Sequence, residues 1–473
     1  MDTKKLRQKI LDLAIHGKLV PQDPNDEPAS VLLERIKAEK ERLIKEGKIK
    51  GSKKSAKASD TPHYEQVPFE IPGNWVWCKI EDIGEVITGN TPSKDRVEYY
   101  GGDTPFFKPT DLDQGIDTRY ASDHLSELGF EQSRKLPVNT ILVTCIGATI
   151  GKTGIITVAG SCNQQINAIV PNKEVTHSYI FYVCVSNYMQ SEIISNASAT
   201  TLPILNKSNF ANLLFPLPPI AEQHRIVKEI GHWFALIDQI EQDKSDLQIV
   251  IKQAKSKILD IAIHGKLVPQ DPNDEPAIEL LKRRKPNFTP CDNGHYENLP
   301  DSWCLTDIKS IFTINPKNKV ADDVIAGFVP MINIADGYSN EFIFESKLWG
   351  DIKKGFTHFA DGDIVVAKIS PCLENRKSVI VTSLPNGIGA GTTELFVFRS
   401  QCVLPEYGLY FFKSDSFINN CAGTFNGVVG QQRVSKSIIE NIKFPLSPIS
   451  EQRRIVDAVH KVFAKLDAIM ENL

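Results

Sequence analysis

The sequence has few of the features that place a protein in a membrane, outside the cell or around a metal. No stretch among its 473 residues approaches the roughly 18 consecutive apolar residues that a membrane-spanning helix needs. No apolar run follows the charged start, so no secretory signal is expected. The nine cysteines form no Cys-x-x-Cys pair, which favours buried reduced thiols over zinc or disulfides. We therefore expect a cytoplasmic protein that binds neither a membrane nor a metal.

The motifs of common enzyme active sites are also missing. There is no Gly-x-Gly-x-x-Gly, His-Glu-x-x-His or Gly-x-Ser-x-Gly string, and no Asn/Asp-Pro-Pro-aromatic string such as amino-methyltransferases use. The segment Gly147–Thr153 resembles a phosphate-binding loop, but three residues separate its glycines where that loop requires four. β-Branched residues flank the segment on both sides, which predicts strand, turn and strand. A nucleotide-hydrolysing enzyme is therefore an alternative that this spacing disfavours.

What the sequence does contain is an internal repeat. Residues 10–29 are ILDLAIHGKLVPQDPNDEPA and residues 258–277 are ILDIAIHGKLVPQDPNDEPA, differing only by Leu13 against Ile261. A second pair is FPLPPIAEQHRIV at 215–227 and FPLSPISEQRRIV at 444–456. Self-similarity of this kind indicates a duplicated structural unit. Each copy holds a variable block between constant segments, and we call residues 63–214 the first variable block and residues 295–443 the second.

The constant segments carry a heptad pattern. Apolar residues alternate at spacings of three and four, which is typical of the a/d seam of a coiled coil. The C-terminal helix repeats the first half of the central one, and the N-terminal helix repeats its second half. Gly17 and Gly265 are expected to end the repeated helices in the left-handed conformation. The predicted seam residues are Ile226, Ile230, Trp233, Ile237, Ile240, Leu247, Ile251, Ile258, Ile261, Ile455, Val459, Val462, Leu466 and Ile469.

Two sets of motifs resemble the conserved regions of type I restriction–modification specificity subunits. These are AIHGKLVPQDPNDEPA, and PLPPIAEQHRIV followed by a heptad helix; LVTCIGATIGKTGI in the first variable block is similar as well. The resemblance covers essentially the whole chain. It implies an α+β fold in which two mixed α/β target-recognition domains are joined by two long antiparallel helices with pseudo-twofold symmetry.

The resemblance also implies the function and the domain organisation. In that family each variable block reads one half of a bipartite, asymmetric sequence in double-stranded DNA, and the chain itself is not catalytic. Two methyltransferase subunits and the restriction (motor) subunits bind the assembly, and S-adenosylmethionine, ATP and Mg²⁺ are expected on those partners. The implied domains are an N-terminal half-repeat with a basic linker (1–62), the first recognition domain (63–214), the central coiled-coil region (215–294), the second recognition domain (295–443) and the C-terminal helix (444–473).

Candidate DNA-contacting residues follow from their chemistry. Guanine is recognised by Arg or Lys, adenine by Asn or Gln, and either by small hydroxyls. For any one of them a solvated surface or a strand-capping role is an equal alternative. In the first block the candidates are Lys108, Thr110, Thr149, Lys152, Thr153, Gln164, Gln165, Lys207 and Ser208. In the second block they are Asn333, Lys368, Arg376, Lys377, Thr392, Gln431, Gln432, Arg433, Lys436 and Ser437.

Charge argues against a strong stand-alone DNA binder. The net charge is −4, and the first block has 10 Lys and Arg against 16 Asp and Glu. The second block has 14 against 16. A protein that grips DNA unaided normally has a basic surface, so we expect the isolated chain to bind weakly and its partners to supply part of the phosphate contacts. A coiled-coil adaptor that binds only proteins is the other alternative.

Overall fold

A computed structural model of the chain describes residues 2–47, 67–198, 202–290, 299–422 and 432–472. The chain divides into two compact units, Met1–Gln242 and Asp243–Leu473, which are described separately. The expected domain boundaries at 62/63 and 294/295, with most of the expected basic linker, lie outside the described residues. Within the described part of the chain, no helix is both long and apolar enough to cross a membrane.

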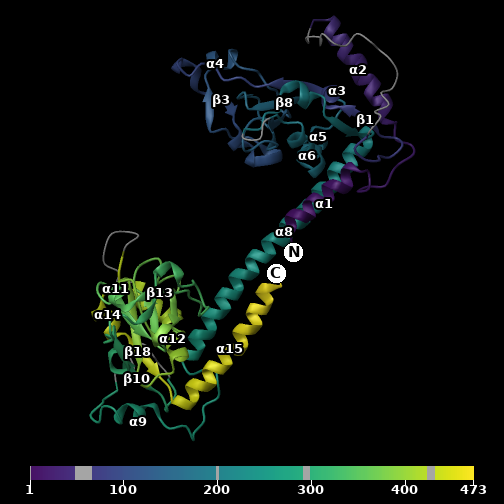
Figure 1. The fold of residues 1–473 in the computed structure, drawn as a ribbon. Coiled ribbons are helices and arrows are strands. Elements are labelled where there is room, and N and C mark those ends of the chain that lie inside the picture. Colours follow the sequence, from purple (N-terminus) through teal and green to yellow (C-terminus); the bar gives the residue numbers. More distant parts are fainter. Residues whose placement is uncertain (1, 48–66, 199–201, 291–298, 423–431, 473) are drawn as a thin grey trace. The chain divides into compact units, whose positions relative to one another are not determined.

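The first unit is a mixed α/β structure (Figure 1). Its helices and strands are α1 (Thr3–Ile15), α2 (Ala29–Lys45), β1 (Val76–Lys79), α3 (Ile80–Ile83), β2 (Gly84–Thr88), η1 (Val97–Tyr99), β3 (Tyr100–Phe107), η2 (Pro109–Asp117), β4 (Asp123–Leu125), α4 (Glu127–Glu131), β5 (Ile141–Thr144), β6 (Thr153–Ile155), β7 (Ser161–Cys162), β8 (Ile166–Pro171), α5 (His177–Val185), α6 (Asn187–Ser195), α7 (Lys207–Ala211), β9 (Leu214–Leu217) and the first half of α8 (Ile220–Ile263).

The second unit begins within α8 and repeats this order with additions. Its elements are α9 (Ala277–Lys282), β10 (Cys304–Asp307), α10 (Ile308–Ile311), β11 (Phe312–Ile314), β12 (Ile325–Val329), η3 (Met331–Asn333), β13 (Glu345–Leu348), α11 (Trp349–Ile352), β14 (Thr357–Ala360), β15 (Ile364–Ala367), β16 (Ser378–Ile380), η4 (Pro385–Gly387), β17 (Ile388–Gly391), β18 (Leu395–Ser400), α12 (Pro405–Lys413), α13 (Asp415–Ala422), α14 (Lys436–Asn441), β19 (Lys443–Leu446) and α15 (Ile449–Glu471).

The sheets of the two units have the same strand order. In the first unit they are β2-β8-β5-β6, β4-β3-β7 and the pair β1-β9. In the second they are β11-β18-β15-β16, β13-β12-β17-β14 and the pair β10-β19, so that β14 is the added strand. The pairs β3·β7 and β12·β17 are parallel, and the other strand pairs of the described sheets are antiparallel. The two variable blocks therefore share one topology despite having little sequence identity.

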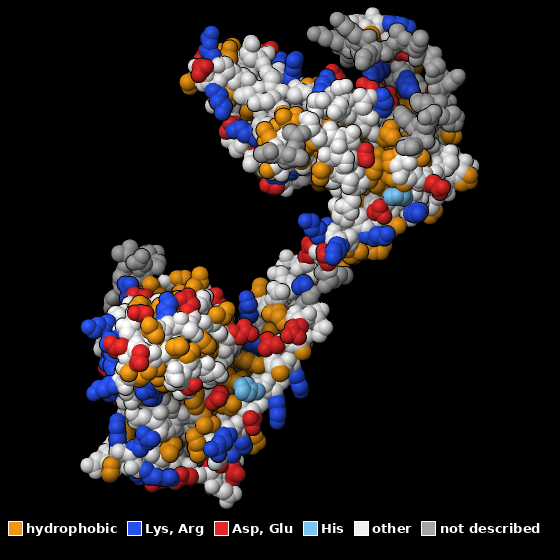
Figure 2. Space-filling view, in the orientation of Figure 1, with side chains coloured by type: hydrophobic (Ala, Val, Ile, Leu, Met, Phe, Trp, Pro, Cys, Tyr) orange, Lys and Arg blue, Asp and Glu red, His pale blue; other side chains and the backbone are white. Residues whose placement is uncertain are grey.

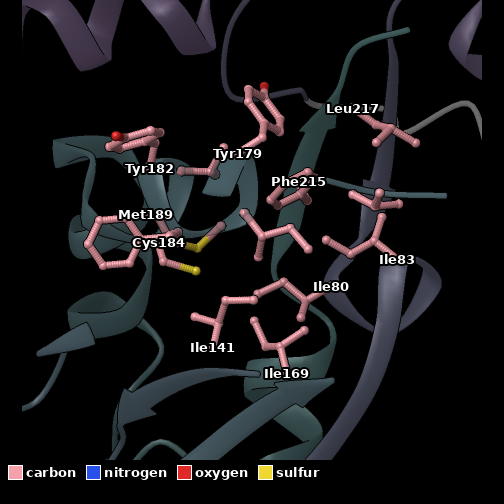
Figure 3. Packing of buried hydrophobic residues seen from close by; sticks show 14 of the residues in the cluster. Ile80, Ile83, Ile141, Ile169, Tyr179, Tyr182, Cys184, Met189, Phe215 and Leu217 are labelled. Carbon is pink, nitrogen blue, oxygen red and sulfur yellow. The ribbon is translucent and has the colours of Figure 1, made fainter. Parts of the chain in front are cut away.

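Alternation along the central strands builds two core layers in each unit. Because successive side chains of a strand point to opposite faces, Ile141 of β5 packs under α5 and α6 whereas Leu142 packs against the layer that holds Phe107. Figure 3 shows residues from β5, β8, β9 and the helices converging in the first of these layers. In β15 of the second unit, the neighbouring residues Ile364 and Val365 likewise pack into two different core layers.

The repeated helices end where the sequence predicted. Gly17 and Gly265 both have a positive φ, +64° and +67°, and each follows the last turn of its helix. A Cβ atom at Gly17 would lie 2.3 Å from Cγ of Pro72, and one at Gly265 would lie 2.5 Å from Cγ of Pro300. Both the backbone conformation and the close approach therefore require glycine.

A buried carboxylate ties the first repeated loop to α8. Trp75 donates from Nε1 to Glu222 over 2.9 Å, and the Gln22 amide donates to the other oxygen of Glu222. Arg225, one helical turn further on, pairs with Asp26 at 2.6 Å. Burial raises the pKa of Glu222, and the two donated hydrogen bonds offset this only in part. We call these five residues the first clamp.

The second unit contains the same arrangement. Trp303 donates to Glu451 over 2.8 Å, Gln270 donates to Glu451 over 2.6 Å, and Arg454 pairs with Asp274 at 2.6 Å. Burial again raises the pKa of the glutamate. These five residues form the second clamp, so the repeated sequence produces a repeated set of contacts.

The heptad helices lie beside one another within each unit, α1 along α8 in the first and α15 along α8 in the second (Figure 1). Arg7 of α1 pairs with Asp238 of α8 at 2.5 Å, and Lys255 of α8 pairs with Asp467 of α15. Of the predicted seam residues, Ile226, Ile230, Ile237, Ile251, Ile455 and Val459 are buried and Ile258, Ile261, Val462 and Leu466 are half-buried.

Four predicted seam positions differ from the expectation, because Trp233, Ile240, Leu247 and Ile469 are exposed. The buried face is turned by one residue at this level of α8: Phe234, rather than Trp233, packs edge-on against Tyr182 of α5 at 5.9 Å between ring centres. In α15, Phe463 packs in the same way on Tyr410 of α12. The helices are therefore held by their own variable blocks as well as by one another.

Candidate nucleic-acid interface

Backbone hydrogen bonds bring three distant loops together at one edge of the first unit. The amide of Cys145, after β5, donates to Gln165, before β8, over 2.7 Å. The amide of Gly147 donates to Pro203 over 3.0 Å, and that of Leu205 donates back to Cys145 over 2.8 Å. The loop after β3 joins them, since Asn163 donates to the carbonyl of Phe107 over 3.1 Å. We call residues 107–114, 145–152, 163–165 and 202–208 the first loop edge.

The second unit forms the equivalent edge with the same bonds. The amide of Lys368 donates to Glu394 over 3.0 Å, that of Ser370 donates to Gln432 over 2.9 Å, and that of Val434 donates to Lys368 over 3.0 Å. Residues 329–336, 368–377, 392–394 and 432–437 are the second loop edge. Most candidates chosen from chemistry alone thus lie on two matching edges, although they are dispersed in the sequence.

Two lysines of the first loop edge are paired with carboxylates. Lys108, at the end of β3, contacts Asp123, and Lys152, before β6, contacts Asp113 of η2 at 2.7 Å. Thr110 and Thr149 are exposed beside them. Thr153 is buried, and its hydroxyl donates to the carbonyl of Gly151 over 2.8 Å, so that its side chain supports the turn.

The two glutamines of the first loop edge differ in exposure. Gln164 is exposed and accepts a hydrogen bond from the hydroxyl of Thr91. Gln165 is half-buried and accepts one from the Asn163 amide over 3.0 Å. Among the described residues, neither side-chain NH₂ group donates a hydrogen bond, which leaves both groups able to reach a base edge.

Short helices place a Lys-Ser pair in the same position in both units. Lys207 and Ser208 open α7, and Lys436 and Ser437 open α14; all four are exposed. Each helix follows directly on the segment that is hydrogen-bonded into its loop edge. Superposing the Phe-Pro-Leu motifs pairs these same residues, and the structure gives them the same local setting.

In the second loop edge, Arg433 faces a carboxylate. Its guanidinium donates two hydrogen bonds to Glu394, of 2.8 and 2.9 Å, and these hold the pKa of Glu394 below its usual value. Lys368 lies over the ring of Phe396, with Nζ 5.5 Å from the ring centre. Asn333 is half-buried in η3.

Two candidates of the second block point into the unit. Arg376 contacts Asp415 and donates from Nε to the carbonyl of Lys413 over 3.0 Å. It has a φ of +59° and occupies the place that Gly151, with a φ of +87°, holds before β6. Lys377 donates to the carbonyl of Ile334 over 2.7 Å. Through these contacts the two side chains stabilise the backbone of their own unit.

The remaining candidates are Thr392, Gln432 and Gln431. The Thr392 hydroxyl is buried and has no hydrogen-bond partner among the described residues. Gln432 is half-buried, and its carbonyl accepts from Ser370. Gln431 lies outside the described residues.

Sequence reasoning missed the carboxylates that face the candidate cations. Asp113, Asp123 and Glu394 were not singled out, although the acidic excess of both blocks was the signal that could have found them. On the face shown in Figure 2, basic and acidic side chains are interspersed on each unit. The positive charge of the loop edges is therefore locally compensated.

The segment that resembles a phosphate-binding loop is a turn between strands, as predicted. It joins β5 to β6, which pair antiparallel, and a strand follows it where a nucleotide loop has a helix. Phe106 and Phe107 are buried in the core. Among the described residues, no three His, Cys, Asp or Glu side chains are grouped so that they could hold a metal ion. All eight described cysteines are free.

Comparisons with known proteins show which family and which relatives the chain is similar to. The family described as the type I restriction modification DNA specificity domain matches residues 72–248 and 300–473. The EcoAI specificity subunit of Escherichia coli is 44% identical over 225 residues, which are 44% of this chain and 38% of that protein. The Escherichia coli EcoEI specificity subunit is 42% identical over 238 residues, which are 46% of this chain and 40% of that protein.

Similarity of fold extends further than similarity of sequence. A structure solved in a study of complex assembly and conformational transition of the type I R-M system has a TM-score of 0.54 at 14% identity, covering 86% of this chain and 94% of its own. The alignments with the two relatives span about two fifths of their length. Because the family match covers well over half of the chain and occurs twice, on the two units that repeat one topology, the chain belongs to the type I restriction–modification specificity subunit family.

Proposed function

We propose that this chain is the DNA-recognition subunit of a type I restriction–modification complex and carries no catalysis of its own. The observation that carries the proposal is the pair of loop edges, which have the same backbone hydrogen bonds but different side chains. One scaffold that presents two different polar surfaces suits the recognition of two different half-sites. The recognition domains are residues 63–214 and 295–443, with 1–62, 215–294 and 444–473 as the constant parts.

The DNA contacts come from those members of the loop edges whose side chains are exposed, or half-buried without being turned into the fold. Side chains that reach solvent can meet base edges and phosphates, whereas Thr153, Arg376, Lys377 and Thr392 are turned into the fold. The proposed contact residues are Lys108, Thr110, Thr149, Lys152, Gln164, Gln165, Lys207 and Ser208 in the first unit, and Asn333, Lys368, Gln432, Arg433, Lys436 and Ser437 in the second.

Partners complete the assembly. Two methyltransferase subunits fit a chain that presents the same clamp twice, and the restriction (motor) subunits join them. S-adenosylmethionine, ATP and Mg²⁺ belong to those subunits. Because carboxylates face Lys108, Lys152 and Arg433, these cations exert little long-range attraction on DNA, and the partners supply part of the phosphate contacts.

Exchange of one variable block tests the proposal. Residues 63–214 are replaced by the corresponding block of another specificity subunit, and the chain is expressed with its methyltransferase partner in a host whose methylome is then sequenced. We expect one half of the modified sequence to change while the other half and the gap are retained. An unchanged target after the exchange would contradict the modular reading and would favour an adaptor that never contacts DNA.

Binding by the isolated chain tests the role of the partners. We expect the purified chain to bind a non-specific duplex weakly at physiological salt and the assembled methyltransferase complex to bind its target tightly. Tight non-specific binding by the chain alone would contradict the proposal that the carboxylates of the loop edges cancel the attraction of their lysines and arginines for DNA.

A further inference from the structure

The second loop edge carries an apolar side chain that the described residues of its unit leave largely uncovered. Ile332 is 84% exposed, the largest exposed fraction among the large apolar residues in the described parts of the chain. It lies in the middle of η3, directly before the candidate reader Asn333. An isoleucine this exposed gains little from folding and leaves apolar surface in water, where it can meet a ligand at this edge.

Strand pairing shows which residue of the first unit stands in the same place. Phe107 at the end of β3 pairs with Cys162 of β7, and Val329 at the end of β12 pairs with Gly391 of β17. A short 3-10 helix starts two residues after each strand end, at Pro109 and at Met331. The second residue of each helix is Thr110 in the first unit and Ile332 in the second. Ile332 therefore occupies the position of a candidate base-reading hydroxyl.

The turn that presents Ile332 is held firmly. The amide of Asn333 donates to Pro330 over 2.9 Å, and the amide of Ile343 donates back to Asn333 over 3.0 Å. Lys377 donates from Nζ to the carbonyls of Ile334 at 2.7 Å and Met331 at 3.4 Å, on either side of the isoleucine. Because this backbone is already ordered, little conformational entropy is lost when the side chain meets a ligand.

Double-stranded DNA offers one apolar group at the base edges of the major groove, the C5-methyl of thymine. We propose that Ile332 contacts the methyl group of a thymine in the half-site that the second variable block reads, and that it is a specificity-determining residue. Thr110 then presents a hydroxyl at the matching place in the other half-site. The inference rests on the proposed DNA-recognition function and names the chemistry that one position recognises.

Deoxyuridine substitution isolates the contact, because uracil is thymine without the methyl group. The assembled methyltransferase complex is titrated with duplexes in which each thymine of that half-site is replaced in turn by deoxyuridine. We expect one replacement to weaken binding by wild-type complex about fourfold, the factor for uncovering one methyl group. With Ile332→Ala, the same replacement is expected to leave affinity unchanged, since the partner of the methyl group is gone.

Val97→Ala is the matched control. Val97 is 80% exposed but lies in η1, before the start of β3, whereas Thr110 follows its end. Strand β3 is bulged, since Tyr100 and Thr104 both pair with Leu125, so Val97 adjoins the end of β3 that lies at Leu125, whereas Thr110 lies beyond the end at Phe107. We expect this variant to keep the wild-type response to every thymine replacement.

Four results would overturn the inference: no thymine in the half-site, no replacement that weakens binding, equal weakening of thymine and uracil duplexes by Ile332→Ala, or an Ile332→Ala chain that no longer assembles with the methyltransferase subunits. The last result would assign Ile332 to a protein partner. Each leaves the proposed function standing as long as the complex still binds a bipartite sequence. Loss of all sequence-specific binding in the wild-type complex would instead refute the proposed function.

Discussion

The two clamps and the two loop edges of this chain show opposite kinds of repetition. The clamps repeat both residue types and distances, with Trp–Glu bonds of 2.9 and 2.8 Å and Arg–Asp pairs of 2.6 Å in both units. Apart from the shared Lys-Ser pair, the loop edges repeat the backbone more than the side chains, because Gln165 stands where the second unit has Glu394 and Cys145 where it has Lys368. Side chains are therefore constant where they hold the scaffold and largely variable on the edges proposed to contact DNA.

The largest expected effect tests whether the clamps are equivalent. Glu222→Ala and Glu451→Ala each leave a buried indole N–H without its acceptor, whereas the exposed glutamine keeps its bond to the carbonyl of Gly17 or Gly265. At about 1–3 kcal/mol per unsatisfied buried donor, each variant should lower the free energy of unfolding by that amount. Urea unfolding measures the loss, and hydrogen exchange of peptides 16–28 and 264–276 locates it.

The control is Glu34→Ala, an exposed substitution on α2, which should lower the free energy of unfolding by less than about 0.5 kcal/mol. Clearly unequal losses would show that the two clamps do not contribute equally to the free energy of unfolding.

The next prediction concerns a difference between the units. Lys413 ends α12 with no exposed surface, whereas Val185 ends α5. Burial, with a contribution from Arg376, lowers the pKa of Lys413 from 10.5 to about 7. Between these values the unfolded chain binds a proton that the folded chain does not, so stability rises with pH in this window and the penalty is complete below pH 7.

Lys413→Met removes this dependence. From pH 7 to pH 9, the free energy of unfolding of wild-type protein should rise by about 2 kcal/mol relative to the variant. Denaturant unfolding at the two pH values measures the difference, and Val185→Met provides the control in the first unit. Parallel pH profiles for wild type and Lys413→Met would mean that the lysine remains charged through its bonds to the carbonyls of Gly337 and Arg376.

A smaller effect tests the symmetry of the phosphate contacts. Lys207→Ala and Lys436→Ala in the assembled complex should each weaken binding to all duplexes by a similar factor and reduce the salt dependence of binding by about one ion. Fluorescence anisotropy over a range of salt concentrations measures the slope. A change in the preferred sequence, without a change in slope, would indicate a base contact for that lysine.

The smallest effect concerns the carboxylates of the loop edges. Glu394→Gln and Asp113→Asn release Arg433 and Lys152, and each should tighten non-specific duplex binding by up to about fivefold, the range of an exposed ion pair. The gain should disappear at high salt, where such charges are screened. If neither variant tightens binding, these carboxylates do not restrain the cations.

Several local features were predictable because a strong local rule governs each. The turn between β5 and β6 followed from β-branched flanks, and the ends of the repeated helices followed from Gly17 and Gly265. The shared topology of the two blocks followed only in outline, since the pairing that forms the whole strand β14 in the second block is a single antiparallel bridge, Leu136 to Gly160, in the first.

Side-chain direction was not predictable. Trp233 and Phe234 differ by one position on α8, about 100° around a helix, and packing on Tyr182 decides which one faces inward. Arg376 and Lys377 have the chemistry of DNA readers, but Arg376 is bonded to the carbonyl of Lys413, and Lys377 to the backbone carbonyl of Ile334 within the edge itself. These choices depend on residues far away in the chain, and a spacing pattern does not contain them.

The backbone bonds that assemble the loop edges have a consequence for how such a protein changes over time. Because the amide of residue 145 or 368 and the carbonyl of residue 165 or 394 form the bond whatever side chains they carry, a mutation at these positions keeps the bond. Under the proposed function, single substitutions there can explore new target sequences without first crossing a loss of stability. A change in one half-site would also leave the other half-site untouched, so a lineage could renew its recognition sequence in separate, individually viable steps.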